Sequence, residues 1–147
     1  MNSALYLLAF VAGAALVLQT GMNALLGRSI GGNPLGAVFV NFSVGAIGML
    51  LFLLATRTAL PSRLQLAAVP AWAWFAGLIG AFYVTVVTIA APRVGALLVL
   101  ALTVAGQMLA SLLVDHFGVL GFPHQPITLT KLVGAALLFA GVLLVAR

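Results

Sequence analysis

The stretch "WAWFAGLIGAFYVTVVTIAAPRVGALLVLALTVAGQMLASLLV", residues 72–114, decides the fold of this chain. A helix crosses the hydrocarbon core of a bilayer with about 20 apolar residues, and this run is twice that length. It must therefore fold back on itself, and "APRVG" at 91–95 contains its strong helix breakers. We expect one span over residues 72–91 and another over 94–114.

Three more apolar runs flank this pair and predict further spans over residues 4–26, 34–55 and 128–146. Asn33 can cap the second of them and Pro34 can begin it, since proline suits the first position of a helix. The polar linker before the third span can hold a short interfacial helix. Because the runs are continuous rather than alternating, helices are favoured over a β-barrel.

The composition requires a bilayer as the solvent. Of 147 residues, 65% are hydrophobic and 5% are charged, whereas soluble domains carry about 25% charged residues. We therefore predict a single all-α transmembrane domain over residues 1–147, with five spans and short loops. The chain has no cysteine, which excludes disulfides and thiolate zinc sites. Its N-terminus lacks a basic segment, which argues against a cleaved signal peptide.

The basic residues lie singly between the apolar runs, as at the ends of membrane spans, so we expect no nucleic-acid partner. One side of the membrane would carry Arg57, Arg63 and Lys131, and the other side Arg28, Arg93 and Arg147. This equal division leaves two alternatives. Either a weaker signal fixes one orientation, or the protein inserts both ways and pairs as an antiparallel dimer, which would supply the inverted repeat of many transporters.

Polar side chains recur at membrane depth. Gln19 and Asn23 lie four residues apart, so they share one helix face. The fourth span carries a stripe of four polar residues spaced by four, which winds slowly around the helix. Such groups either clamp helices together or line a cavity for a polar solute. We assign to a substrate pathway Gln19, Asn23, Asn41, Thr103, Gln107 and Ser111.

Asp115, which completes the stripe, is the only acidic residue and so the only carboxylate that could carry a coupling proton. It could equally sit in water at the end of its span. His116 and His124 are near it in sequence, but one Asp and two His across a loop are a poor metal site, and we expect neither metal nor cofactor. Gly134 and Gly141, seven residues apart, predict a flat strip for helix packing within the chain or for a dimer seam.

The sequence resembles a known family over nearly its whole length. The resemblance is carried by "GAALVLQTGMNALLGRSIGGNPLGAVFVNFSVG" (13–45), "GAFYV" (80–84), "AAPRVGALLVLALTVAGQMLASLLVDHFGVLG" (90–121) and "LVGAALLFAGVLL" (132–144). Within these segments the specific features are Gln19 with Asn23, Asn41 with Gly45, Pro92-Arg93, "AGQ" at 105–107 and "DHFG" at 115–118. Together they are similar to the YdcZ-like branch of the drug/metabolite transporter superfamily.

The resemblance implies a bacterial inner-membrane protein that is a candidate exporter. Relatives occur as half-size chains, paired chains and fused double-length chains. The related small multidrug resistance transporters are antiparallel dimers with a glutamate in the first span that exchanges protons for cationic drugs. This chain has Gln19 and Asn23 in its first span instead, which puts proton-coupled efflux of cations in doubt.

We therefore expect a transporter that moves a small polar or amphiphilic solute, neutral or zwitterionic, by alternating access. Its partners would be the bilayer, the solute, and a second copy or a homologous half-size chain. The alternative is a non-transporting scaffold or regulatory subunit whose amides only lock helices. We do not expect an enzyme, since no nucleophile–base pair, metal cluster or phosphate loop is visible.

Overall fold

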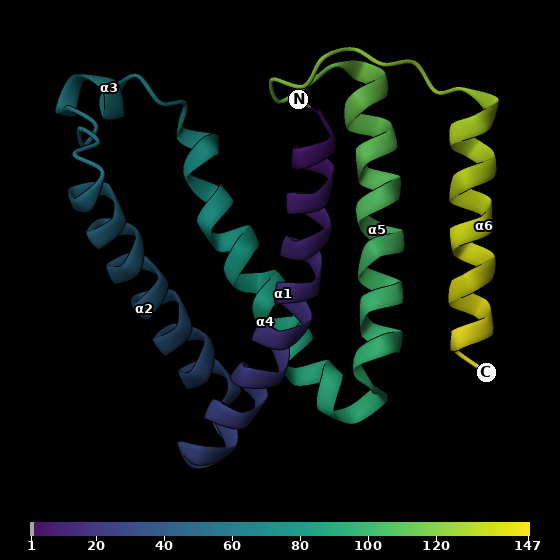
Figure 1. The fold of residues 1–147 in the computed structure, drawn as a ribbon, viewed down its shortest axis with the longest axis horizontal. Helices are drawn as coiled ribbons and strands as arrows, with labels where there is room; N and C mark the ends of the chain where they lie inside the picture. The colour runs from purple at the N-terminus through teal and green to yellow at the C-terminus, as the bar shows by residue number, and fades with distance from the viewer. Residues whose placement is uncertain (1) are drawn as a thin grey trace. The chain divides into compact units, whose positions relative to one another are not determined.

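The computed structural model describes residues 2–147, and these residues form helices and connecting loops without a strand. The all-helical prediction is confirmed. The elements, drawn in Figure 1, are α1 (Asn2–Ser29), α2 (Pro34–Ala55), α3 (Arg63–Ala67), the 3₁₀ helix η1 (Ala71–Phe75), α4 (Ala76–Val94), α5 (Ala96–Phe117) and α6 (Leu129–Val145).

Four segments of the described chain are long and apolar enough to cross a membrane: Ser3–Ser29, Pro34–Ala55, Ala71–Val94 and Ala96–Phe117. The fifth predicted span coincides with α6, which is apolar but only 17 residues long. Four spans are therefore supported by length and composition, and α6 is apolar but shorter than these four segments.

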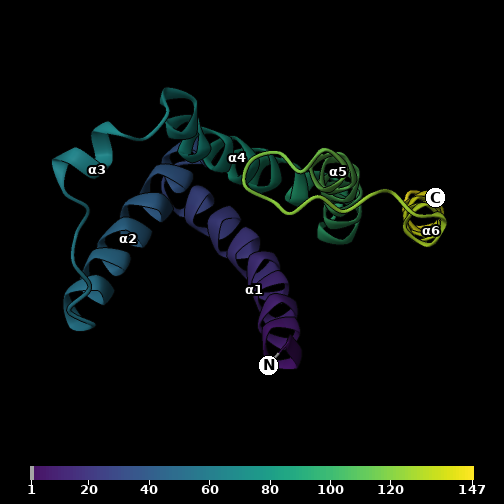
Figure 2. The ribbon, with the colours of Figure 1, turned by 90° about the horizontal axis from the view of Figure 1, so that it is seen from above.

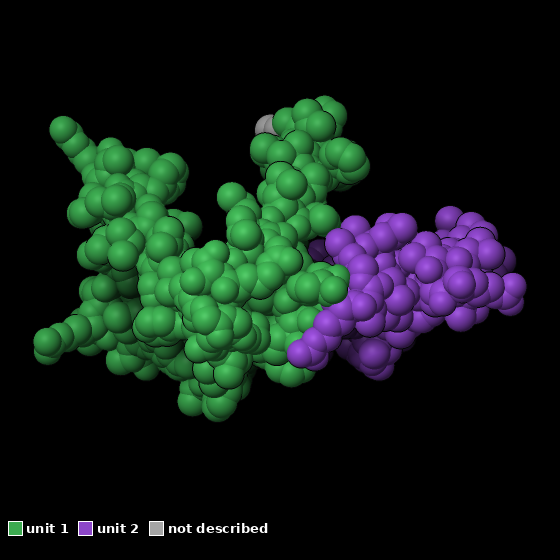
Figure 3. Space-filling view, turned by 90° about the horizontal axis from the view of Figure 1, so that it is seen from below, with its two compact units in different colours: residues 1–92 green, residues 93–147 purple. Residues whose placement is uncertain are grey.

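The chain divides into two compact units, coloured separately in Figure 3. The first unit covers residues up to Pro92, and the second runs from Arg93 to Arg147. Each unit is described by itself below.

In the first unit, α1 and α2 form a hairpin whose turn is encoded locally. Gly31 and Gly32 adopt positive φ values of 82° and 77°, which glycine reaches without strain. The Asn33 side chain accepts a 2.9 Å hydrogen bond from the backbone N–H of Gly36, and Pro34 follows at the first helical position. The predicted cap and start of the second span are confirmed. α1 extends a few residues further at both ends than the predicted span.

The two helices meet near this turn and diverge away from it, as the views in Figures 1 and 2 agree. The buried residues of the hairpin accordingly cluster at the end next to the turn, where small side chains allow close approach. They are Asn23, Gly27, Ala37 and Val38.

The linker after α2 contains the predicted short helix. Ser62 and Gln65 form a capping box around α3: each side chain accepts a hydrogen bond from the other residue's backbone N–H. The two tryptophans of the predicted third span lie in η1, and α4 begins only at Ala76.

The break between α4 and α5 lies within the predicted "APRVG" segment, but its position differs from the prediction. Pro92 is inside α4, which continues to Val94, and the break is at Gly95 with φ 93° and ψ 142°. Proline in the last turn costs one backbone hydrogen bond but keeps helical dihedral angles. Gly95 interrupts the helix with a positive φ, which glycine reaches readily.

In the second unit, α5 and α6 pack as antiparallel neighbours. The buried apolar residues of these two helices are Val99, Ala105, Ala135 and Val142. α5 runs three residues past its predicted end, to Phe117, so Asp115 is in its last turn rather than in the loop. Gly118 ends α5 in the left-handed conformation. Thr128 caps the start of α6, because its side chain accepts a hydrogen bond from the backbone N–H of Lys131.

Candidate functional site

The polar residues of α1 face α2. Gln19, Asn23 and Gly27 follow one another at spacings of four, and Gly27 lies against Pro34 and Ala37 of α2. Further from the loop between α1 and α2, Gln19 Nε2 donates a long hydrogen bond of 3.5 Å to Asn41 Oδ1. Three residues of the predicted pathway thus belong to the α1–α2 hairpin, and two of them are bonded to each other.

Asn23 lies between Gln19 and Gly27 on the same face of α1 and has a different environment. Its side chain is only 3% exposed, and its Nδ2 atom has no hydrogen-bond partner among residues 2–147. A buried donor without an acceptor costs about 1–3 kcal/mol. Proteins rarely keep such a group, so it is a position where a ligand acceptor would be stabilising.

Thr88 of α4 is the second buried polar residue of this kind in the described chain. It is 3% exposed and its hydroxyl has no partner among the described residues. In addition Pro92, four residues on, has no N–H to donate to the Thr88 carbonyl. α4 approaches α2 beside Phe42, whose ring lies 3.9 Å from the position of a Cβ on Gly80.

Thr88 is not among the residues assigned to the pathway from the sequence. The signal that could have found it is the combination of threonine and proline at a spacing of four within a span. That combination frees a backbone carbonyl next to a hydroxyl.

The residues of the polar stripe of α5 have different environments within the described chain. Thr103 Oγ1 donates 2.9 Å to the Leu100 carbonyl of its own helix, which satisfies the hydroxyl locally. Gln107 is exposed. Ser111 and Asp115 line a pocket of the second unit.

This pocket is the polar end of a groove between α5 and α6. It has a volume of about 280 Å³ and is lined by Met108, Ser111, Leu112, Asp115, Lys131 and Gly134. The Lys131 ammonium donates to Gln125 and Pro126 oxygens at 3.4–3.5 Å. No salt bridge joins it to Asp115 in the described structure. The proton-coupling role of Asp115 stays a prediction.

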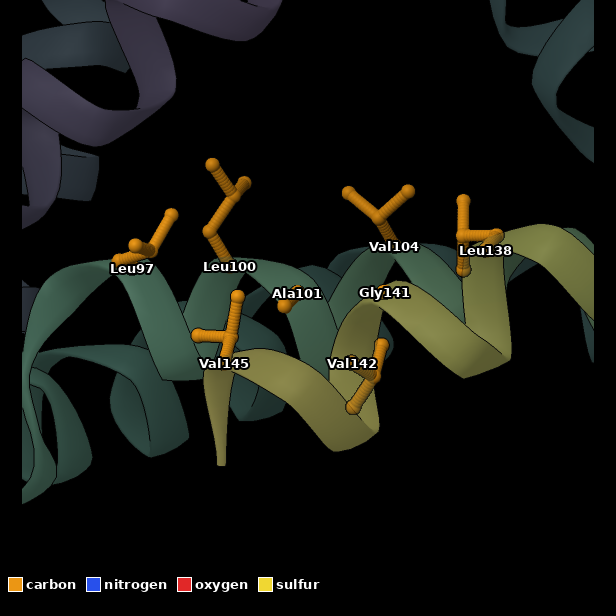
Figure 4. Close-up of a pocket in the computed structure, with 8 residues that line it drawn as sticks. All are labelled: Leu97, Leu100, Ala101, Val104, Leu138, Gly141, Val142 and Val145. Carbon is orange, nitrogen blue, oxygen red and sulfur yellow. The ribbon is translucent and has the colours of Figure 1, made fainter. Parts of the chain in front are cut away.

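The apolar end of the groove lies further along the same helix pair and has a volume of about 350 Å³. Figure 4 shows Leu97, Leu100 and Val104 of α5 along one wall, with Gly141 and Val145 of α6 beside them. Apart from its own helix, no part of the described chain lies within 4 Å of where a Cβ would stand on Gly134 or Gly141. Their predicted role, in helix packing within the chain or in a dimer seam, stays a prediction.

The loop after α5 is tied back to that helix. The Gln125 N–H donates 2.7 Å to the Asp115 carbonyl, and the Ile127 N–H donates 3.3 Å to His116 Nδ1. The His116 and His124 rings are 6.2 Å apart. Among the described residues, no three metal-ligating side chains form a cluster.

The amides of α1 belong to the first unit and the α5 stripe to the second. That they face one another across a common cavity stays a prediction.

Comparison with known proteins gives one family. Residues 4–144 match the family model described as "Putative inner membrane exporter, YdcZ". No curated protein and no solved structure matches the chain. Since the match spans nearly the whole sequence, and the apolar helices suit a membrane, the chain belongs to the YdcZ family of inner membrane exporter-like proteins.

Proposed function

We propose that this protein moves a small polar or amphiphilic solute across the inner membrane by alternating access. The family description supports export in general. The observation that carries the proposal is the Asn23 amide, which is buried with an unused donor.

The chemistry of the first unit defines what it could bind. Asn23 Nδ2 would donate to a carbonyl, hydroxyl or carboxylate oxygen of the solute, and the Thr88 hydroxyl could donate or accept. Both are neutral, as are Gln19 and Asn41. A simple cation would find no charge partner among these residues, so the set favours a neutral or zwitterionic solute.

In this proposal α6 is the fifth span. Its 17 residues rise about 26 Å, somewhat less than the roughly 30 Å hydrocarbon core, within the range that membranes accommodate. Lys131 in its first turn and Arg147 after its end can reach the two interfaces with their long side chains. The protein would work as a homodimer or with a homologous partner, in one orientation or in both.

The competing function is a scaffold or regulatory subunit whose amides only hold helices together. The Gln19–Asn41 hydrogen bond is what such a clamp requires. The unpaired Asn23 amide is not, because it contributes no bond between helices.

Accessibility to water separates the two functions. The chain has no cysteine, so Asn23→Cys introduces a unique thiol. Val38→Cys is the matched control, since Val38 is 5% exposed in the same hairpin and is apolar. A transport pathway predicts that a membrane-impermeant thiol reagent labels the first variant in vesicles and not the second. Equal protection of both thiols would contradict a pathway through Asn23 and favour the scaffold.

The solute itself can be sought by a thermal-shift screen of metabolites on purified protein, since a ligand of the folded state raises its apparent stability. A ligand that stabilises the wild type and not Asn23→Leu would belong to this site.

A further inference from the structure

The two pockets between α5 and α6 lie on one continuous face of the helix pair. On α5 their lining residues recur at spacings of three and four from Leu97 to Asp115, and on α6 from Lys131 to Val145. Such spacings keep residues on one side of a helix. The groove therefore has a charged end and an apolar continuation.

The charged end holds an acid and a base that do not neutralise each other. Asp115 is the only acid of the sequence, and its carboxylate accepts no hydrogen bond from a described side chain. The Lys131 ammonium donates hydrogen bonds to neutral oxygens of Gln125 and Pro126. Opposite charges that share a pocket without pairing are complementary to a ligand that carries both charges.

We propose that this groove binds one zwitterionic phospholipid with a primary amine in its headgroup. The lipid ammonium lies against Asp115 and the lipid phosphate against Lys131. Ser111 can donate to a phosphate oxygen.

The apolar continuation identifies the ligand as a lipid rather than a small water-soluble zwitterion. From Asp115 to Val104 the α5 axis rises about 16 Å, which is roughly half the thickness of the hydrocarbon core. An acyl chain that follows the groove from the headgroup thus reaches Val104 and Leu138, which line the near end of the apolar pocket. A small zwitterion would leave this length of groove empty.

Gly134 lines the part of the groove that the acyl chain of the lipid must pass. A Cβ added there meets nothing of the described chain beyond its own helix, so Gly134→Leu can fill the groove without a clash inside the unit. Gly141→Leu is the matched control, because it makes the same change on the same face, two turns further along.

Native mass spectrometry of the purified full-length protein tests the proposal by titration with phosphatidylethanolamine. Phosphatidylglycerol with the same acyl chains and free glycerophosphoethanolamine serve as comparison ligands. We expect phosphatidylethanolamine to be retained over phosphatidylglycerol, and the free headgroup not to bind. Equal retention of both lipids would overturn the charge assignment, and binding of the free headgroup alone would replace the lipid by a small zwitterion.

The variants assign the contacts. Lys131→Gln should weaken phosphatidylethanolamine binding about fivefold, the effect of one basic residue beside lipid phosphate. Asp115→Asn should weaken it while sparing phosphatidylglycerol. Gly134→Leu should abolish it, and Gly141→Leu should not. Unchanged binding in the near-isosteric Asp115→Asn would refute the contact between the lipid ammonium and Asp115. Equal loss of binding in the two glycine variants, together with loss of a dimer, would refute a lipid site within one chain and favour a second copy as the occupant.

Discussion

Replacing Asn23 by leucine is the sharpest test of the candidate site, because the two roles of the amide predict opposite changes in stability. In the structure Asn23 Nδ2 is buried and unpaired, so its removal abolishes a desolvation cost of about 1–3 kcal/mol. We expect the free energy of unfolding of Asn23→Leu to be unchanged or raised by about 1 kcal/mol, with solute binding lost.

The matched variant is Gln19→Leu on the same helix face. It breaks the hydrogen bond to Asn41, an interaction worth about 0.6 kcal/mol in membranes on average. It also leaves the side-chain oxygen Oδ1 of Asn41 without its hydrogen-bond donor. We therefore expect Gln19→Leu to lower the free energy of unfolding by about 1 kcal/mol, the opposite sign from Asn23→Leu.

Denaturant titration in micelles measures both changes by linear extrapolation. Because leucine is larger than asparagine, Asn23→Ala shows whether overpacking contributes. If Asn23→Leu and Asn23→Ala both lose as much stability as Gln19→Leu, while the folded protein still binds solute, the amide is a clamp and the pathway assignment is refuted.

Three further predictions concern topology, assembly and the loop. Reporters for each side of the membrane, fused to the C-terminus, should both give signal, and added lysines on one set of loops should select one orientation; signal from one side only would contradict dual insertion. Gly141→Leu should reduce crosslinking between copies in membranes while insertion is normal, and undiminished crosslinking would exclude it from a dimer seam. Gly118→Ala should lower the free energy of unfolding by about 1–2 kcal/mol, because the φ of Gly118 is 59° and an added Cβ would lie 3.1 Å from the Cβ of His124. An unchanged midpoint in a denaturant titration would contradict this and show that the loop rearranges without cost.

The α1–α2 turn could be read from the sequence because its signals are local. Asn33 caps and Pro34 begins a helix through bonds to residues three or four positions away, and the glycines before them supply the positive φ. The same holds for the capping box of α3. The residue at which α4 ends does not follow from local signals in the same way, since Pro92 and Gly95 both break helices. The break is at Gly95 because its backbone has a positive φ, which proline cannot adopt.

What the sequence by itself determined is that this chain is a helical membrane protein of the YdcZ family, because the length of apolar runs and the spacing of breakers are properties of the chain alone. Only the tertiary structure decided which polar residues have partners. Gln19 and Asn23 look alike in sequence, yet one meets Asn41, 22 positions away, and the other meets no acceptor among the described residues. In the same way Ser111 and Asp115 lie in a groove while Gln107 is exposed. Whether an amide or a charge is paired depends on how a second helix packs against it. The distance between groups on two helices is not encoded in the spacing of residues along one helix.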